Sequence, residues 1–407
     1  MSTPADSDSA APSPASRRRN VILLALCQAF FMTSTSAIVT SAALIGHSLA
    51  EDKALATLPL AMQFIAVMAV TAPASLLMKR IGRRDGFTVG VCIGLAGAVL
   101  AIVAIGNSDF LLFCLACLLI GAFNAFGQYY RFAAADTAEH AFKSRAISLV
   151  MAGGVIASIG PLLASFSKDL LPDDVFAGVY VMIAILYLAS LATLRFVAIP
   201  RPGAEERSHG GRPLHRIMRQ PLFITAVLGG MIGYMLMSLL MASTPLAMHG
   251  AGHGFFDTAQ VIQWHVFAMF APAFFTGHLI RRFGTPIVMA AGAILIAACV
   301  AINLGGFNLA YFWIGGIALG VGWCFLFIGA TTLVTETYSP AEKAKTQAAN
   351  DFLVFGSVAC AALLSGILHE WIGWRAMNYA ALPFVAIVLI ALFAMLRARR
   401  RDAGLAD

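Results

Sequence analysis

Polar side chains occur inside several long apolar runs of this sequence, where each is costly to bury in a membrane and is therefore a candidate for function. In the run 110–132, Asn124, Gln128 and Arg131 share one face if the run is helical. Arg131 would give that face a permanent positive charge, because a guanidinium stays protonated even when partly buried. Such a face can bind an anionic or strongly hydrogen-bond-accepting solute. The alternative is that Arg131 extends to the membrane surface and binds nothing.

Other apolar runs also carry polar or aromatic side chains that suit a binding site. Gln28 and Thr35 fall on one helical face of the run 21–49, and Tyr234 and Ser238 stand one helical turn apart in the run 221–247. Trp323 lies in a glycine-rich part of the run 309–334. Aromatic and small polar groups together suit a partly apolar organic solute. The alternative is that the hydroxyls bond to their own helices and the tryptophan packs inside a bundle.

Proton coupling needs ionisable groups within the membrane, and the sequence offers few. No Asp or Glu lies in the middle of a long apolar run. His265 lies toward one end of the run 255–280 and titrates near neutral pH, so it either carries a proton or is a hydrogen-bonded structural histidine. No cluster of His, Asp or Glu has a catalytic spacing, and Cys114 and Cys117 have no neighbouring His. We therefore expect no enzymatic activity, no cofactor and no metal site.

The elements that must position these residues are predicted from hydrophobicity. Hydrophobic residues make up 60% of the 407 residues and charged residues 12%, which is not the composition of a soluble domain. Apolar stretches of about 20 residues are long enough to cross a bilayer as helices. Such stretches occupy residues 21–49, 54–78, 87–105, 110–132, 146–166, 175–197, 221–247, 255–280, 286–304, 309–334, 346–367 and 374–396. We therefore expect an all-α membrane protein with twelve transmembrane helices.

The distribution of charge predicts how these helices are oriented. When both termini are placed on one side, all of the 27 Lys and Arg residues except Lys53, Lys168 and Arg375 fall on that side. Basic segments stay in the cytoplasm during membrane insertion, so we expect a multi-pass protein of the inner (plasma) membrane with both termini cytoplasmic. The net charge of +7 thus reflects topology. We expect the lipid bilayer as a partner, through its anionic headgroups, and no nucleic acid.

A polar segment at residues 200–219, expected to be a cytoplasmic linker, divides the chain into two halves. Residues 21–199 and 220–397 would each hold six helices, with a disordered cytoplasmic tail at 1–20 and another cytoplasmic tail at 398–407. The halves are pseudo-symmetric, since the stretch from Lys79 to Gly82 has a counterpart from Arg281 to Gly284. Parallel repeats of this kind are a transporter architecture, in which the solute binds at the midplane between the halves.

These two basic turns resemble the loop signature of the major facilitator superfamily. The stretch Ser75 to Gly86 keeps the Gly-Arg-Arg of that signature, and Gly277 to Pro286 keeps its leading glycine, but the acidic position is Lys79 in one copy and Arg281 in the other. The resemblance implies that the first, fourth, seventh and tenth helices line a central cavity, which would bring the polar and aromatic candidates to the substrate. It also implies an inner gate of charged residues. The candidates are Arg83, Arg84, Asp136, Arg145, Arg281, Arg282, Glu336, Lys345 and Asp351.

The resemblance predicts a secondary active transporter that moves a small organic solute by alternating access, with protons as the candidate coupling ion and a monomer as the working unit. Gly160 and Pro161 resemble part of the antiporter signature, so we expect an exporter. One alternative is an importer or facilitative carrier of a nutrient or vitamin-like metabolite. An alternative of another class is a membrane receptor or scaffold that transports nothing. Such a protein would fill its centre with bulky apolar residues, whereas this chain offers uncharged polar ones there.

Overall fold

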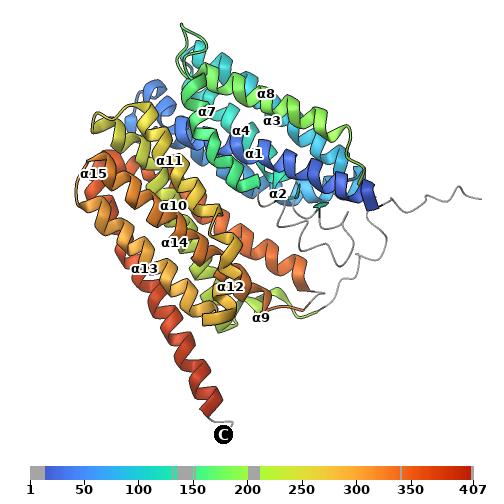
Figure 1. Ribbon diagram of the computed structural model, residues 1–407, viewed down its shortest axis with the longest axis vertical. Helices are drawn as coiled ribbons and strands as arrows, with labels where there is room; N and C mark the ends of the chain where they lie inside the picture. Colours follow the sequence, from blue (N-terminus) through green and yellow to red (C-terminus); the bar gives the residue numbers. More distant parts are fainter. Residues whose placement is uncertain are drawn as a thin grey trace, which may run out of the picture.

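The computed structural model describes residues 14–130, 133–134, 150, 153–199, 211–339 and 342–404. Helices are the regular secondary structure of these ranges, which confirms the expected all-α fold (Figure 1). The helices before residue 200, coloured blue to green, form one group, and those after residue 210, coloured yellow-green to red, form a second. We call them the N-terminal helices and the C-terminal helices.

The N-terminal helices are α1 (Pro14–Leu49), α2 (Leu58–Ile81), α3 (Arg83–Gly106), α4 (Phe110–Gly127), α7 (Gly160–Ser167) and α8 (Ala177–Leu194), with short 3-10 helices η1 (Lys53–Leu55) and η2 (Ala157–Ile159). The C-terminal helices are α9 (Leu214–Met218), α10 (Pro221–Gly250), α11 (Phe255–Phe270), α12 (Ala273–Phe283), α13 (Thr285–Leu304), α14 (Leu309–Thr335) and α15 (Lys343–Gly404).

Nine helical stretches are long and apolar enough to cross a membrane, within the ranges given above. The expected spans 346–367 and 374–396 lie in α15, whose path is interrupted at Gly373 by a positive φ of 76°. The expected span 255–280 is divided between α11 and α12. The structure therefore shows a helical fold built for the membrane, whereas the count of twelve spans stays a prediction.

Both basic turns reverse the chain through a glycine. Gly82 joins α2 to α3 with a φ of 94°, and Gly284 joins α12 to α13 with a φ of 87°. Residues with a β-carbon rarely adopt this conformation, which explains why each turn has glycine at this place. The glycine amides donate to the carbonyls of Met78 and Ile280 at 2.9 Å and 2.8 Å, and so complete the preceding helices. The repeat in the sequence is thus also a repeat of backbone geometry.

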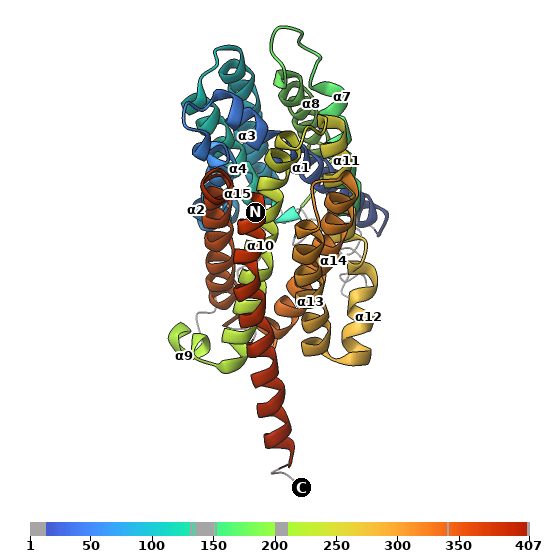
Figure 2. The same cartoon turned by 90° about the vertical axis from the view of Figure 1, so that its left-hand side faces the viewer.

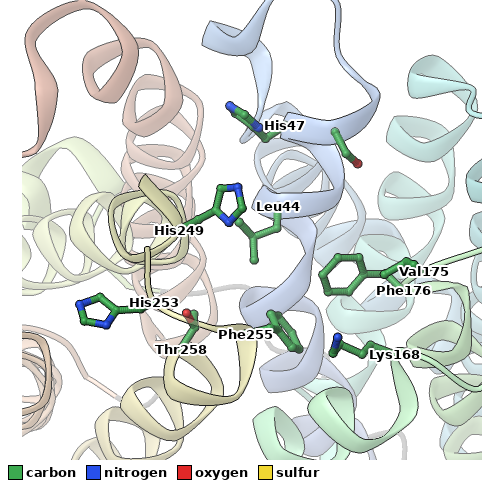
Figure 3. A pocket seen from close by; sticks show the side chains of 10 residues that line it. Leu44, His47, Lys168, Val175, Phe176, His249, His253, Phe255 and Thr258 are labelled. Atoms are coloured by element: carbon green, nitrogen blue, oxygen red, sulfur yellow. The ribbon is translucent and has the colours of Figure 1, made fainter. Parts of the chain in front are cut away.

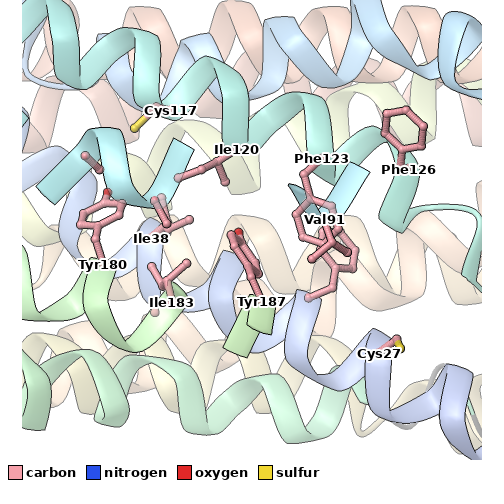
Figure 4. Packing of buried hydrophobic residues seen from close by; sticks show 14 of the residues in the cluster. Cys27, Ile38, Val91, Cys117, Ile120, Phe123, Phe126, Tyr180, Ile183 and Tyr187 are labelled. Atoms are coloured by element: carbon pink, nitrogen blue, oxygen red, sulfur yellow. The ribbon is translucent and has the colours of Figure 1, made fainter. Parts of the chain in front are cut away.

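Each group of helices has its own hydrophobic core. One cluster of buried side chains extends from Val21 to Val197 and the other from Ala226 to Met395. In the first, the ring of Phe123 on α4 makes an edge contact with Tyr187 on α8, with centroids 4.9 Å apart (Figure 4). Each core holds the helices of its own group together. Smaller clusters of buried side chains join the two groups. The predicted half boundaries, 21–199 and 220–397, stay a prediction.

The two groups of helices touch at one end of the bundle, which we call the distal end and which comprises residues 47–57, 168–176, 249–255 and 363–374. Leu246 of α10 packs there against Ala43 and Ala56. The amide of Gly366 on α15 donates to Oγ1 of Thr57 at 3.0 Å. The distal end lies opposite the basic turns, so the charge distribution predicts that it faces away from the cytoplasm. Figure 2 shows the last part of α15 extending beyond the other helices, away from this end.

Arg212, between the two groups, is fixed to the loop that joins α14 to α15. Its guanidinium forms a bidentate ion pair with Glu342, with Nη2 2.8 Å from Oε2 and Nε 2.9 Å from Oε1. The Glu342 side chain is 2% exposed and also accepts the amide of Ser339. These bonds, that of Arg212 foremost, hold the pKa of Glu342 well below its usual range. The carboxylate therefore stays charged at physiological pH, and this contact is not a pH switch there.

Replacing Glu342 with glutamine should loosen this attachment, because a neutral amide cannot accept all the bonds that the carboxylate accepts. The backbone amides of Arg212 and Ser339 both donate to Glu342. We expect their hydrogen exchange to accelerate by about tenfold, which corresponds to the loss of one hydrogen bond to a charged group. Exchange mass spectrometry of the protein in nanodiscs measures this rate. Glu370→Gln at the distal end is the matched control, and equal exchange in Glu342→Gln and wild type would contradict the prediction.

Candidate substrate site

Five aromatic side chains from four C-terminal helices meet near the middle of the bundle. We call this the aromatic cluster: Tyr234 (α10), Phe270 (α11), Trp323 and Phe327 (α14), and Phe355 (α15). The rings of Trp323 and Phe327 are stacked, with centroids 4.9 Å apart and an interplanar angle of 10°. Tyr234 meets Trp323 edge-on at 5.3 Å and Phe355 at 5.9 Å, and Phe270 meets Trp323 at 6.2 Å. The cluster offers both ring faces and ring edges to a planar aromatic solute.

Trp323 is the most enclosed member of the cluster. It is 6% exposed, while the other four rings are partly exposed. Its indole N–H finds no hydrogen-bond acceptor among the described residues. A buried donor without an acceptor costs about 1–3 kcal/mol, and a bound solute with a carbonyl or ring nitrogen would remove that cost. The structure thus places Trp323 and Tyr234, which were both predicted to bind substrate, next to each other. The indole N–H of Trp323 is available to a bound solute.

The face of α1 that was predicted from Gln28 and Thr35 is turned toward the C-terminal helices. Met32, between these two residues on that face, packs against the same small cluster (Ala157, Ile262 and Val266) as Phe270 of the aromatic cluster. One turn further, Val39 packs near Ala242 of α10. The Thr35 hydroxyl donates to the carbonyl of Phe31 at 3.0 Å and is occupied by its own helix. The Gln28 side chain is buried, and its Oε1 accepts no hydrogen bond from the described residues.

The corresponding face of α10 carries Tyr234 and Ser238. Continuing along this face by whole turns leads to Ala242 and Leu246, both of which pack against N-terminal helices. Ser238 is buried. The face predicted from the spacing of Tyr234 and Ser238 therefore lies where the two groups of helices meet.

Carboxamides on α2 and α4 are buried without their full set of partners. Asn124 is buried and its Oδ1 accepts no hydrogen bond, while Gln128, at the end of α4, is partly exposed. Gln63 on α2 is 1% exposed, and neither its Oε1 nor its Nε2 has a partner in the described part of the chain. Gly121, one turn before Asn124, packs so closely on the Gln63 backbone that a β-carbon would not fit. Arg131 lies outside the described residues.

His265 lies between α11 and α14, apart from the aromatic cluster. Its side chain is buried, and Nδ1 lies 2.8 Å from the carbonyl oxygen of Gly316, so Nδ1 carries the proton and donates. Nε2 has no partner within the described ranges. The bond to Gly316 fixes the ring orientation, and a role in carrying protons stays a prediction.

The members of the predicted gate that the structure describes lie at the end of the bundle opposite the distal end. Arg84 donates to the carbonyl of Arg195 at 3.1 Å, and the Arg282 guanidinium lies 5.3 Å from the ring centroid of Phe283. Arg281 lies in the last turn of α12. Other members have interaction partners: Arg83, Glu336, Lys345 and Asp351. Asp136 and Arg145 lie outside the described residues, so the inner gate stays a prediction.

A cavity of about 270 Å³ lies at the distal end, away from the aromatic cluster (Figure 3). Both groups of helices line it, and its walls are formed by Leu44, His47, Ser48, Lys168, Val175, Phe176, His249, His253, Phe255 and Thr258. Its volume is below the range of about 300–1,000 Å³ that is usual for binding sites of organic ligands. We therefore place the candidate substrate site at the aromatic cluster and return to the distal cavity below.

Sequence reasoning missed four residues that the structure brings into consideration: Gln63, Phe270, Phe327 and Phe355. Gln63 had a signal, since it is the single amide of the apolar run 54–78. The phenylalanines had none, because most apolar runs of this chain contain phenylalanine. Only the packing of four helices distinguishes these three rings from the others.

Comparisons with known proteins agree with this architecture. The family model of the Major Facilitator Superfamily matches residues 24–301 and 264–406. The chain is 43% identical over 383 residues to a protein of Brucella anthropi named riboflavin transporter RfnT, which covers 93% of this chain and 96% of that protein. It is 28% identical to YdeG of Bacillus subtilis, an uncharacterized MFS-type transporter, over 89% of this chain and 88% of that one.

Solved structures with the same fold are more distant in sequence. A bacterial homolog of the human lysosomal transporter Spinster has a TM-score of 0.72 at 17% identity, with 96% of this chain and 99% of that chain covered. The human organic anion transporter MFSD10 has a TM-score of 0.67 at 13% identity, with 94% and 100% covered. At these identities the likeness concerns the fold alone.

Proposed function

This chain belongs to the major facilitator superfamily of transporters, and from that premise we propose that it is an uptake carrier for riboflavin or a chemically similar vitamin. The observation that carries the proposal is the 43% identity, over nearly the whole length of both chains, to a protein named as a riboflavin transporter. The proposal takes up the vitamin carrier that the sequence left as an alternative to an exporter.

The aromatic cluster supports this substrate class. Riboflavin consists of a planar tricyclic ring, one edge of which bears carbonyl and N–H groups, and a flexible chain of hydroxyls. The planar ring suits the rings of Tyr234 and Trp323, which meet at 5.3 Å. Buried amide oxygens that accept no hydrogen bond from the described residues, at Gln28, Gln63 and Asn124, suit the N–H groups of the polar edge. Riboflavin carries no charge, so the proposal does not require Arg131 to bind substrate.

The direction of transport in this proposal is inward. The expectation of export depended on Gly160 and Pro161. Close packing offers a structural explanation for glycine at position 160, which does not involve the direction of transport. Gly160 begins α7 directly against the carbonyl of Thr33 on α1, where a β-carbon would not fit. The proposal keeps alternating access driven by an ion gradient, with protons as the candidate ion, a monomer as the working unit, and the inner membrane with both termini in the cytoplasm.

Expression of the protein should allow a bacterial strain that cannot synthesise riboflavin to grow on low concentrations of the vitamin. Radiolabelled riboflavin should accumulate in these cells, and excess unlabelled riboflavin should compete for uptake. An unrelated nutrient such as a labelled sugar should not compete, which is the control for general leakiness. The proposal fails if the protein is present in the membrane at normal abundance and labelled riboflavin enters no faster than in cells with an empty vector.

A further inference from the structure

The distal cavity brings two histidines from opposite groups of helices together. His47 lies in the last turn of α1 and His249 in the last turn of α10, and both line the cavity (Figure 3). Their ring centroids are 6.4 Å apart, at an interplanar angle of 63°. Phe176 and Phe255 make a second contact between the groups in the same cavity, with centroids 4.9 Å apart. The cavity is therefore part of the contact that closes the distal end.

Neither of the two imidazole rings forms a hydrogen bond with the residues that the structure describes. Among the described residues, no donor or acceptor pairs with the ring of His47 or of His249, and His249 is exposed. His253, in the same cavity, differs because its Nε2 lies 2.8 Å from the carbonyl oxygen of Phe307. His47 and His249 can thus take up protons from the cavity without breaking a structural bond.

Positive charge already lies close to this pair when the distal end is closed. Lys53 is held beside His47, because its ammonium group donates to the carbonyls of His47 and Ala50 at 2.8 Å and 2.7 Å. Lys168 lines the cavity but is paired with Asp169. The titratable and charged groups that surround the pair from neighbouring elements are Lys53, Lys168, Asp169, His253, His369 and Glu370. Of these, Asp169 and Glu370 carry negative charge, and Asp169 is paired with Lys168.

We propose that His47 and His249 form a proton-sensitive latch, which lets the two groups of helices close at the distal end when the rings are neutral and drives them apart when both are protonated. Histidine is the side chain whose ordinary change of charge falls between about pH 5 and about pH 8, and the latch would respond in this range. Above this range the rings are uncharged and the closed state is favoured. Below it two positive charges face each other beside Lys53, and separating them into water relieves the repulsion. Acid on the distal side therefore opens that side.

The test measures the separation of the two groups directly. Spin labels are placed at Asn107→Cys, at the distal end of α3, and at Ala310→Cys, at the distal end of α14; both positions are exposed. The exposed native cysteines, Cys92 and Cys360, are replaced by alanine. Pulsed electron paramagnetic resonance then gives the distance distribution of the purified protein in nanodiscs. We expect the ratio of the longer to the shorter distance to rise about tenfold from pH 8 to pH 5.5, equivalent to about 1.4 kcal/mol.

Substitutions show whether the histidines cause the response. Replacing both His47 and His249 with glutamine should remove the dependence on pH, and either single replacement should weaken it because the repulsion needs both charges. His249→Lys places a permanent charge in the pair, so protonation of His47 alone completes the repulsion and the dependence on pH should remain. His278→Gln is the matched control, since His278 is an exposed histidine on α12 far from the distal end. It should keep the wild-type response.

Two results would overturn the latch: a wild-type distance distribution that is the same at both pH values, or an acid response that survives in the double glutamine variant. The experiment contains no riboflavin. Its outcome is therefore independent of whether riboflavin is the transported solute.

Discussion

Replacing Trp323 with leucine should weaken riboflavin binding by about tenfold to a hundredfold. Stacking of a planar heteroaromatic ring on an aromatic side chain is worth about 1–3 kcal/mol, and each 1.4 kcal/mol is a factor of ten in affinity. Leucine removes both the ring that stacks at 4.9 Å on Phe327 and the unpaired indole N–H. Trp323→Phe keeps an aromatic ring and loses only the donor, so its affinity should lie between those of Trp323→Leu and wild type.

Flavin fluorescence provides the measurement, because stacking on an aromatic side chain quenches it. Titration of riboflavin with the purified protein in nanodiscs gives the affinity, and uptake into cells at equal membrane abundance gives the transport rate. Trp371→Leu is the matched control, since Trp371 is 76% exposed and lies at the distal end, away from the aromatic cluster. Wild-type affinity in Trp323→Leu would show that the aromatic cluster does not hold the substrate.

Replacing Gly366 with valine should reduce transport at least tenfold while leaving the protein in the membrane. A β-carbon at Gly366 would lie 2.7 Å from Oγ1 of Thr57 and 2.8 Å from the carbonyl oxygen of Ala54, and both atoms belong to the opposite group of helices. Overpacking of a tight contact typically costs about 1–3 kcal/mol, which is enough to shift a two-state equilibrium about tenfold or more. The clash exists only when the distal end is closed. The proposed alternating access requires that closed state, so the carrier would remain open at this end.

The spin-label pair described above measures this effect independently of transport. In Gly366→Val the longer distance should predominate at pH 8, where the wild type is expected to be closed. Gly250→Val is the matched control, because a β-carbon at Gly250, also near the distal end, meets no atom within 4 Å. Normal uptake by Gly366→Val, or an unchanged distance distribution, would contradict the proposed closure between Thr57 and Gly366.

The membrane itself explains how much of this fold could be predicted from the sequence. A chain in lipid must satisfy its backbone hydrogen bonds within each segment, so a long apolar run has one available structure, the helix. Clusters of Lys and Arg between apolar runs located both basic turns in the sequence. In the structure, the chain reverses in these turns at Gly82 and Gly284. Family membership followed from these turns. Tyr234 and Trp323 were predicted to bind substrate, through the resemblance and their aromatic character. The structure brings their rings together, and the binding itself stays a prediction.

What the sequence could not decide is which faces of the helices meet. The spans are largely apolar on all sides, because lipid and protein interior accept the same side chains. Periodicity therefore does not separate a lipid-facing phenylalanine from one in the candidate substrate site. Phe270, Phe327 and Phe355 therefore became visible only when the packing of four helices placed them around Trp323. The same holds for His47 and His249, 202 residues apart in the chain and 6.4 Å apart in space. Their proximity depends on how the two groups of helices close, which tertiary structure alone decides.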